Sequence, residues 1–540
     1  MADLKIEEQV RPASMGDGEV GPEKVVLSKD EQHLARLGYK QEFFRHLGLF
    51  ENWAATYISM NFVSGMPVLF SFAMTTGGPK AAFANWTMIG GLSFIVSLAM
   101  AEIAAAFPTA GGIYFWSYRL GGQRHGRFLS WMTAWWNWAG WICVVPGVQQ
   151  GATNFLLSAL EIQYPTATVI STGWFSWLLT ALGMVLAMLP NVLSPRVLKL
   201  YFRFAVFVFF VLFAVYWVWF PVAARGKFQN AEGVFNKFNN GINEGTEKQA
   251  SDSYAWVIGI LFGAWEFYGY DASAHLAEET NDASETVAKG MWAATLCAWV
   301  LSVPTLIMVL FCMQDFDTIV SASYSNNWAE YLVQLLGEPA AVAVLVILWI
   351  DSTCATTSCF MSAQRVTFAI SRDGVLPFSK YFRQLNSRRT PLHAAYLVLF
   401  LSVAITCAVI GSTVAFSAIT ATATIATNFS YLIPIAARHT VGRSEFPPAR
   451  YNLGRWSVVI GTISCLYIMF QFVVLLLPQL YPVTAETLNY APICIGIVSL
   501  VSLAGWWLPF GLGGRYWFTG PKRTIDDFSG QEGEEVVQEK

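Results

Sequence analysis

The sequence predicts an all-α polytopic membrane protein with about twelve transmembrane helices. The chain has 540 residues, of which 55% are hydrophobic and 13% are charged. An average soluble domain has a charged fraction of about 25%. The apolar residues come in blocks of about 18 to 25, the length that a helix needs to cross about 30 Å of hydrocarbon. The net charge of −3 and the lack of a basic excess argue against a nucleic-acid partner.

The apolar blocks predict the following spans, in chain order. They lie near residues 50–74, 82–106, 128–158, 172–191, 196–220, 254–275, 288–313, 339–370, 391–411, 414–437, 456–478 and 489–509. Spans three and eight exceed the usual length, so we expect them to tilt or to extend into the cytosol. Between spans seven and eight, residues 314–337 have helical apolar spacing, which predicts short helices over the outer vestibule.

The positions of lysine and arginine predict that both termini are cytosolic. With the N-terminus inside, the excess of basic residues falls on the inner side, as the positive-inside rule requires. The first 45 residues contain no apolar core ending in a small-residue cleavage site, so the first span is expected to direct insertion. The polar tails, residues 1–30 and 522–540, are expected to be unstructured. The outer loops carry five of the 33 basic residues: Lys80, Arg225, Lys227, Lys237 and Lys248.

Span six contains two carboxylates and a glycine where a membrane helix is normally apolar. An isolated acid in hydrocarbon costs roughly 2.5–3.5 kcal/mol, and an interrupted span is how transporters build a midplane site. We expect Gly269 to break the helix and Asp271 to N-cap the half-helix that resumes. Glu266 either faces a cavity, where it meets a cation or a proton, or pairs with a basic neighbour. Trp265 is either a core aromatic residue or a lid over the substrate.

Span one carries a second possible interruption, at Asn61, Ser64, Gly65 and Pro67. Gly65 tolerates positive φ, and Pro67 suits the first turn of a new half-helix. A break there would leave N–H groups aimed at a cavity, which would form a carboxylate or anion site. The alternative is a kinked but continuous helix. Spans one and six lie five spans apart, as expected for two inverted five-helix repeats.

Two further charged residues lie within predicted spans. Glu102 lies near the end of span two. It is expected to have a packing and helix-capping role, with Arg119 or Arg124 as its partner. Arg203 lies about 12 Å into span five at about 1.5 Å per residue. It either snorkels or supplies a fixed positive charge near spans one and eight in place of sodium. After span two the chain is expected to break and to turn along the inner face at Pro108, Gly111 and Gly112.

Span eight contains a hydroxyl-rich stretch, residues 351–358. Such side chains either ligate Na⁺ or bond the carbonyls of their own helix, and the second is more common. The eight cysteines form no CxxC motif of the metal-binding type, and they are interpreted as small apolar residues that pack inside the protein. The sequence therefore predicts neither a metal site nor a cofactor.

Four motifs in this order resemble the amino acid–polyamine–organocation (APC) transporters. They are VSGMP in span one, AEIAAAFPTAGGIYFW after span two, GAWEFYGYDASAHLAEE in span six, and AISRDGVLPFSKYF followed by TPLHA after span eight. The likeness runs from about residue 37 to 510 and is closer to the fungal amino acid/choline permeases, which include GABA, choline and thiamine carriers.

The resemblance implies the five-plus-five inverted-repeat fold of leucine transporters with two extra helices, and alternating access around broken helices one and six. The expected divisions are a cytosolic tail (1–48), the first repeat (49–220), an extracellular loop (221–253), the second repeat (254–438), helices eleven and twelve (439–510) and a cytosolic tail (511–540).

The resemblance also implies roles for individual residues. The loop Val63-Ser64-Gly65 falls where the family's Gly-Ser/Thr-Gly loop binds the substrate carboxylate. Trp265 matches the occluding aromatic residue, Gly269 the helix break, and Asp271 an acid found in some proton-coupled relatives. Val63 departs from the family glycine, which narrows the approach of a carboxylate, and Arg203 is the nearest substitute for a span-five lysine.

Glu266 is the second departure, since relatives often have a small polar residue there. A carboxylate beside the gate favours a cationic or amine-bearing substrate in a partly dry site. The sequence thus predicts a secondary transporter that imports amino acids, GABA-like compounds or related small amines through the plasma membrane, coupled to protons. A vacuolar membrane is the alternative location, and the oligomeric state is left open.

Two alternatives to this function remain at this point. One is a carrier for cations such as choline, thiamine or polyamines, and the other is a nutrient-sensing transceptor. An enzyme is disfavoured because no nucleophile–base pair or phosphate-binding loop is present. A channel is disfavoured because the broken helices lack a charged ring or filter.

Overall fold

The computed structural model describes residues 28–243, 248–412, 414–444 and 446–522. Residues 44–521 form one compact unit, and a second unit holds the chain up to Phe43 and from Lys522. In the second unit α1 (Lys29–Arg36) begins with a capping box, in which Ser28 and Glu31 exchange side-chain to backbone hydrogen bonds of 2.8 and 3.2 Å. The two predicted tails lie outside the described residues, except that residues 28–30 begin this helix and Lys522 ends the described chain.

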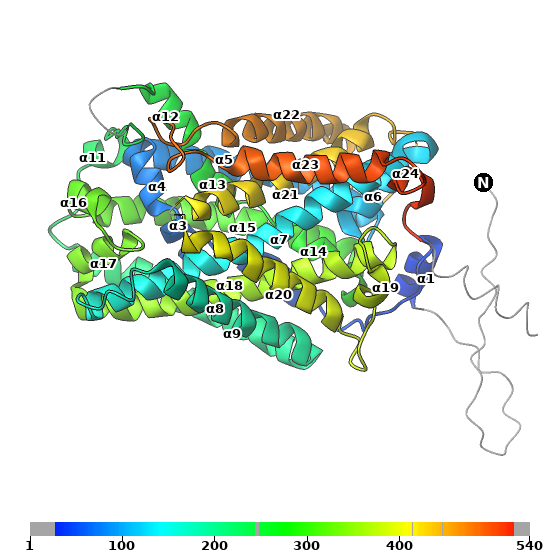
Figure 1. Cartoon of the computed structure of the whole chain (residues 1–540), viewed down its shortest axis with the longest axis horizontal. Coiled ribbons are helices and arrows are strands. Elements are labelled where there is room, and N and C mark those ends of the chain that lie inside the picture. The colour runs from blue at the N-terminus through cyan, green and yellow to red at the C-terminus, as the bar shows by residue number, and fades with distance from the viewer. Residues whose placement is uncertain (1–27, 244–247, 413, 445, 523–540) are drawn as a thin grey trace, which may run out of the picture. The chain divides into compact units, whose positions relative to one another are not determined.

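The large unit is a bundle of helices, and the described residues contain no strand (Figure 1). Within the described part of the chain, eight helices are long and apolar enough to cross a membrane. They are α5 (Gly78–Ala106), α8 (Gly173–Leu193), α9 continued by α10 (Pro195–Ala223), α15 (Ala283–Cys312), α18 (Glu338–Arg372), α20 with its last turn (Leu392–Ile410), α21 (Ala415–His439) and α22 with its first turn (Gly454–Leu475).

Four further segments complete the predicted twelve. Two are continuous: α7 (Gly122–Gln163) and α23 (Ala491–Trp507). Two are interrupted, and each consists of three short helices. The first contains α2 (Leu49–Ser59), α3 (Phe62–Val68) and α4 (Phe70–Thr75), and the second contains α12 (Asp252–Ile258), α13 (Leu261–Glu266) and α14 (Ala272–His275). The predicted all-α membrane fold is confirmed.

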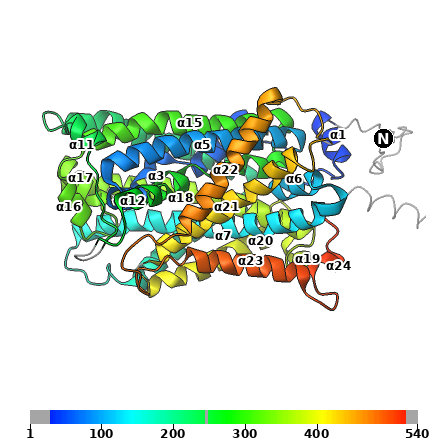
Figure 2. The ribbon, with the colours of Figure 1, turned by 90° about the horizontal axis from the view of Figure 1, so that it is seen from above.

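Short helices gather at the two ends of the bundle (Figures 1 and 2). One end holds α11 (Ala231–Phe235), α16 (Phe316–Ser321) and α17 (Trp328–Leu336), and the other holds α6 (Gly112–Leu120), α19 (Ser379–Phe382) and α24 (Gly514–Trp517). The short helices predicted within residues 314–337 are therefore present. Their linker is fastened to α7 and to the end of α3, because Ser325 N donates to Glu161 (2.8 Å) and Asn326 Nδ2 to the Pro67 carbonyl (3.1 Å).

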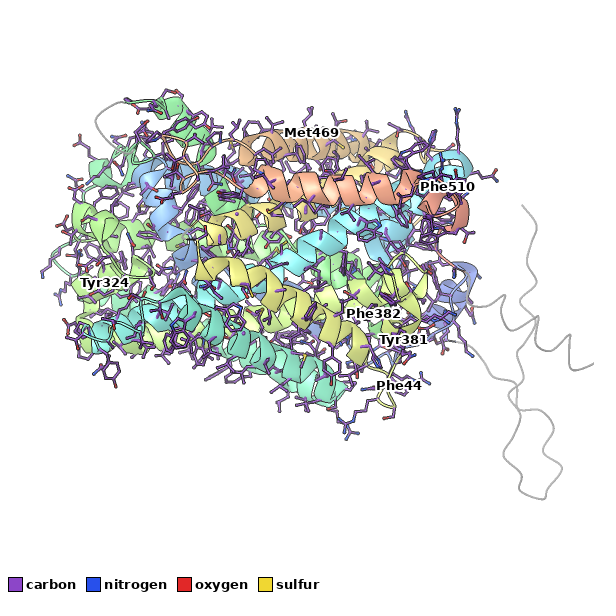
Figure 3. All side chains as sticks on the ribbon, viewed as in Figure 1. Phe44, Tyr324, Tyr381, Phe382, Met469 and Phe510 are labelled. Carbon is purple, nitrogen blue, oxygen red and sulfur yellow. The ribbon has the colours of Figure 1, made fainter. Side chains whose placement is uncertain are left out.

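Polar and apolar side chains separate as a bilayer requires. In the centre α7 packs against both α18 and α21, and the residues of α18 from Asp351 to Arg372 are buried. Large apolar side chains such as Phe207, Leu466 and Leu500 are exposed on the outer faces of the spans. Figure 3 shows Met469 projecting outward from α22 in the same way. These outer faces are suited to contact lipid tails.

The turn after α5 forms as predicted, but Glu102 has other partners. Gly112 has φ +49° where α6 begins, and this conformation favours glycine. Glu102 is 1% exposed and accepts hydrogen bonds from Leu453 N (3.2 Å) and the Ser457 hydroxyl, with Arg438 Nε 4.0 Å away. Arg119 and Arg124 are exposed, so the predicted pairing of Glu102 with either of them is wrong. Glu102 instead fastens the start of α22.

Candidate functional site

The first interrupted helix breaks at the N-terminal edge of the predicted cluster. Met60 is not helical (φ −113°, ψ 44°), and Asn61 N-caps α3 by accepting the Val63 N–H at 3.3 Å. Gly65 lies inside α3, and Pro67 lies near its end rather than in its first turn. The predicted interruption is thus present, but Gly65 and Pro67 do not form it: the helix is broken at Met60, and the Asn61 side chain caps the helix that follows.

The second interrupted helix breaks where predicted. Helix α13 ends at Glu266, and α14 resumes at Ala272. Between them Gly269 has φ +85°, a conformation that glycine adopts without strain. A Cβ at Gly269 would lie 3.4 Å from the Trp141 ring of α7, so the break is also closely packed.

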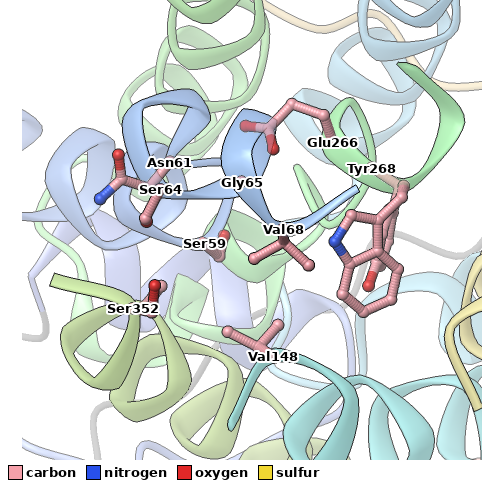
Figure 4. Close-up of a pocket in the computed structure, with 11 residues that line it drawn as sticks. Ser59, Asn61, Ser64, Gly65, Val68, Val148, Glu266, Tyr268 and Ser352 are labelled. Carbon is pink, nitrogen blue, oxygen red and sulfur yellow. The ribbon is translucent and has the colours of Figure 1, made fainter. Parts of the chain in front are cut away.

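A cavity lies between the two breaks, α7 and α18 (Figure 4). Five of the predicted substrate residues line it. Val63 does not: it is buried, and its carbonyl accepts a hydrogen bond from Tyr216 of the π-helical turn Val215–Trp219 (2.9 Å). Gly269 does not line it either. The lining residues are Ser59, Asn61, Ser64, Gly65, Val68, Val148, Trp265, Glu266, Tyr268, Ser352 and Ala355.

Among the described residues that line the cavity, Glu266 is the charged one, and none is a lysine, arginine or histidine. It is 5% exposed, and its Oε2 rests against Gly65, where a Cβ would lie 1.8 Å from that oxygen. Its Oε1 has no hydrogen-bond partner within the described part of the chain. Figure 4 shows the carboxylate beside α3 at Gly65. A buried carboxylate with an unused acceptor is suited to bind a positive group.

A second buried acid is bonded to one of the residues that line the cavity. Asp351 of α18 is fully buried, and its Oδ2 accepts a hydrogen bond from Asn61 Nδ2 at 2.6 Å. The same asparagine therefore caps α3 and ties it to α18. Asp351 was not predicted as a site residue. The signal available in the sequence was an acid in one span and an amide side chain, Asn61, in another that could bond it. The neighbouring hydroxyls bond carbonyls of their own helix, as Thr356 and Thr357 do at 3.0 and 3.1 Å.

Trp265 covers one side of the cavity, and a glycine makes room for it. Its ring centroid lies 5.6 Å from that of Tyr268. A Cβ at Gly147 of α7 would lie 2.8 Å from the edge of the Trp265 ring and 3.6 Å from Ile419 Cγ2. Gly147 thus sets the position of the indole over the cavity.

We therefore predict that Gly147→Ala lowers substrate uptake without loss of the folded protein. The added methyl group displaces the Trp265 ring, because cores resist even one extra carbon. Initial uptake rates and detergent melting temperatures are the measurements. Gly496→Ala is the matched control, since a Cβ at Gly496 of α23 meets nothing within 4 Å. Unchanged uptake by Gly147→Ala would contradict the role of the indole.

Asp271 does not cap α14 with its side chain, so that prediction is wrong. Its carboxylate instead accepts hydrogen bonds from the side chains of Asn137, Trp141, His275 and Tyr431. These partners come from α7, α14 and α21, and the tertiary contacts replace the local cap. Asp271 is fully buried and lies outside the cavity lining.

Arg203 also lies outside the cavity lining. Its side chain is 58% exposed, and its guanidinium is 3.3 Å from Glu51 at the start of α2. Lys199, one turn earlier, lies 2.9 Å from the same carboxylate. The arrangement fits the snorkelling alternative rather than a fixed charge beside the substrate.

The interrupted helices around a buried, charged cavity define a helical membrane transporter. The chain belongs to the amino acid permease family, whose model matches residues 50–500, and this family is part of the APC superfamily. It is similar to the thiamine transporter thi9 of Schizosaccharomyces pombe, with 30% identity over 88% of this chain and 84% of the relative. It is also similar to the amino-acid permease BAT1 homolog of Oryza sativa subsp. japonica, with 31% identity over 91% of this chain and 95% of the relative. The amino-acid permease BAT1 of Arabidopsis thaliana is 29% identical over 93% of this chain and 98% of the relative.

Proposed function

We propose that this permease carries a small cationic or amine-bearing substrate, with the Glu266 carboxylate as the counter-charge. The observation that carries the proposal is the unused Glu266 Oε1 in a cavity whose lining includes no basic residue. A positive group placed there gains a charge-assisted hydrogen bond in a low-dielectric site.

Glu266 also disfavours a substrate carboxylate at residues 63–65, which lie in the first turn of α3. The family resemblance assigns that carboxylate to residues 63–65, but Glu266 Oε2 already rests against Gly65. Two carboxylates about 4 Å apart repel by about 4 kcal/mol at an effective dielectric constant of about 20. The thiamine carrier among the relatives supports a cationic substrate. Amino acids are the second candidate, supported by the relatives named as amino-acid permeases, and their ammonium group would bind Glu266.

Transport would proceed by alternating access around the two breaks. The non-helical residues Met60 and Gly269 supply the flexible points, and Trp265 would close over the bound substrate. We propose proton coupling and a site in the plasma membrane, with the vacuolar membrane as the alternative. Uptake should then rise at acidic outside pH and persist when sodium is removed; pH-independent uptake that needs sodium would refute the coupling.

Competition uptake in a permease-deficient yeast tests the substrate class. The competitors are thiamine, choline, a polyamine and neutral amino acids. Glu266→Gln keeps the size of the side chain and removes its charge. Since a hydrogen bond to a charged group is worth about 1.5–3 kcal/mol, uptake of cations should fall about 10- to 100-fold. The exposed Glu486→Gln is the matched control. Unchanged cation uptake by Glu266→Gln would refute the proposed role.

A further inference from the structure

A buried polar cluster lies next to the break in the second interrupted helix. At its centre the Asp271 carboxylate accepts four hydrogen bonds. The donors are Asn137 Nδ2 (3.1 Å), Trp141 Nε1 (3.0 Å), His275 Nε2 (3.0 Å) and Tyr431 Oη (2.6 Å). Asp271 is 0% exposed and His275 is 2% exposed. The cluster holds α14 against α7 and α21, and its five residues do not line the cavity.

The hydrogen bonds fix which atom can take up another proton. An indole N–H and an amide NH₂ only donate, so the Asp271 carboxylate must be the acceptor in those two bonds. Asp271 Oδ2 takes part in three of the four bonds and Oδ1 in the fourth. An ionised Asp271 carboxylate can only accept, so a neutral His275 beside it carries its proton on Nε2 and leaves an acceptor at Nδ1. His275 Nδ1 is buried and has no hydrogen-bond partner within the described residues. It lies beside Gly112, at which a Cβ would be 3.2 Å away.

From this geometry we propose that His275 Nδ1 is the site that binds the coupling proton. The inference rests on the proposed function, since it assigns the proton of that transport cycle to one atom. Proton uptake converts the imidazole to an imidazolium beside the Asp271 carboxylate and changes the cluster from one negative charge to none. Histidine is the side chain that changes charge between about pH 5 and 8.

The charged groups on the elements packed against α14 are engaged elsewhere. Arg365 and Arg372 of α18 pair with Glu279 and Glu278, Glu285 of α15 pairs with Lys289, and Glu51 of α2 pairs with Lys199. Asp351 of α18 is bonded to Asn61, and Arg119 of α6 is exposed. The other titratable groups that interact electrostatically with Asp271 are Tyr268, Tyr270, Tyr431 and Cys359, which ordinarily stay neutral near pH 7. Asp271 is therefore the charge that meets His275.

Trp141 links this cluster to the cavity. Its indole N–H donates to Asp271, and its ring packs against Gly269 at the break. A Cβ at Gly269 would also be 3.9 Å from the hydroxyl of Ser59, which lines the cavity. A change in the charge of the cluster thus acts on the break and, through it, on the cavity wall. This contact gives proton binding a route to alternating access.

His275→Gln in the purified full chain in liposomes tests the proposal. Glutamine keeps a donor near the position of Nε2 but cannot take up a proton. We expect substrate accumulation driven by a pH gradient to be lost, while substrate counterflow without a gradient is retained. The exposed His393→Gln is the matched control. Gradient-driven accumulation with an unchanged pH profile in His275→Gln would overturn the proposal.

Tyr431→Phe provides a second, independent readout. It removes one donor from Asp271, which makes the anionic cluster less stable relative to its protonated form. The midpoint of the pH profile of uptake should move toward alkaline pH by about one unit, which corresponds to about 1.36 kcal/mol and is near the lower end of what a hydrogen bond to a charged group contributes. An unmoved midpoint would overturn the proposal even if His275→Gln failed to fold. Absence of counterflow of any amine by the wild type would instead refute the proposed function.

Discussion

Replacing Gly65 with alanine should abolish transport. The added Cβ would lie 1.8 Å from Glu266 Oε2 and 2.8 Å from Glu266 Cδ, so the carboxyl group has to leave its position against α3. Overpacking of a core typically costs about 1–3 kcal/mol, and here the cost falls on the side chain assigned to the substrate. We expect the variant to reach the membrane and to show no uptake above background.

The control for Gly65→Ala is another Gly→Ala change, at Gly411, where a Cβ meets nothing within 4 Å. Uptake rates and surface expression are measured together, so that loss of transport is separated from loss of protein. Wild-type uptake by Gly65→Ala would show that Glu266 does not occupy the position described, and the proposed substrate site would fail with it.

The second large effect is expected on stability, from Arg365→Met. Arg365 Nε lies 2.6 Å from Glu279 Oε1, and both side chains are almost fully buried (4% and 6% exposed). The change leaves Glu279 with His46, 3.9 Å away, as its ion-pair partner. Removal of one partner from a buried ion pair typically costs about 3–5 kcal/mol, because a charge remains in a low-dielectric site.

Thermal unfolding in detergent measures this effect. Arg365→Met should melt well below the wild type, and the double variant Arg365→Met with Glu279→Met should recover part of the loss, since no isolated charge is left. Equal melting temperatures for the wild type and Arg365→Met would contradict the importance of this pair.

The helices were predictable because length and hydropathy are local properties. The predicted span 82–106 corresponds to α5 (Gly78–Ala106), and the predicted span 391–411 corresponds to Leu392–Ile410. Gly269 was predictable for a similar reason, since a glycine between polar residues marks a break by itself. An interruption of span one beginning at Asn61 was predicted, but its position at Met60 was not, because it depends on the Asn61 side chain, which bonds both Val63 and Asp351.

Glu266 could be identified from the sequence because a carboxylate inside a membrane span has a high free-energy cost, whatever its tertiary neighbours are. The partners of other acids depend on tertiary packing, which spacing does not reveal. Asp271 accepts hydrogen bonds from Trp141 and Tyr431, which lie 130 and 160 residues away in the sequence. Because the local sequence shows neither partner, it supported only the prediction of an N-cap. Glu102 likewise accepts a hydrogen bond from Leu453 N at the start of α22, which is 351 residues away in the sequence, so spacing could not predict this partner.

The central claim is that Glu266 receives the positive group of the substrate. A cryo-EM structure of the full chain with an accepted cation, thiamine or an amine from the uptake panel, tests it most directly. We expect the cationic nitrogen within about 4 Å of the Glu266 carboxylate, the range of an ion pair, with Trp265 over the ligand. A substrate bound away from Glu266, or a substrate carboxylate seated against Gly65 with Glu266 turned aside, would contradict it.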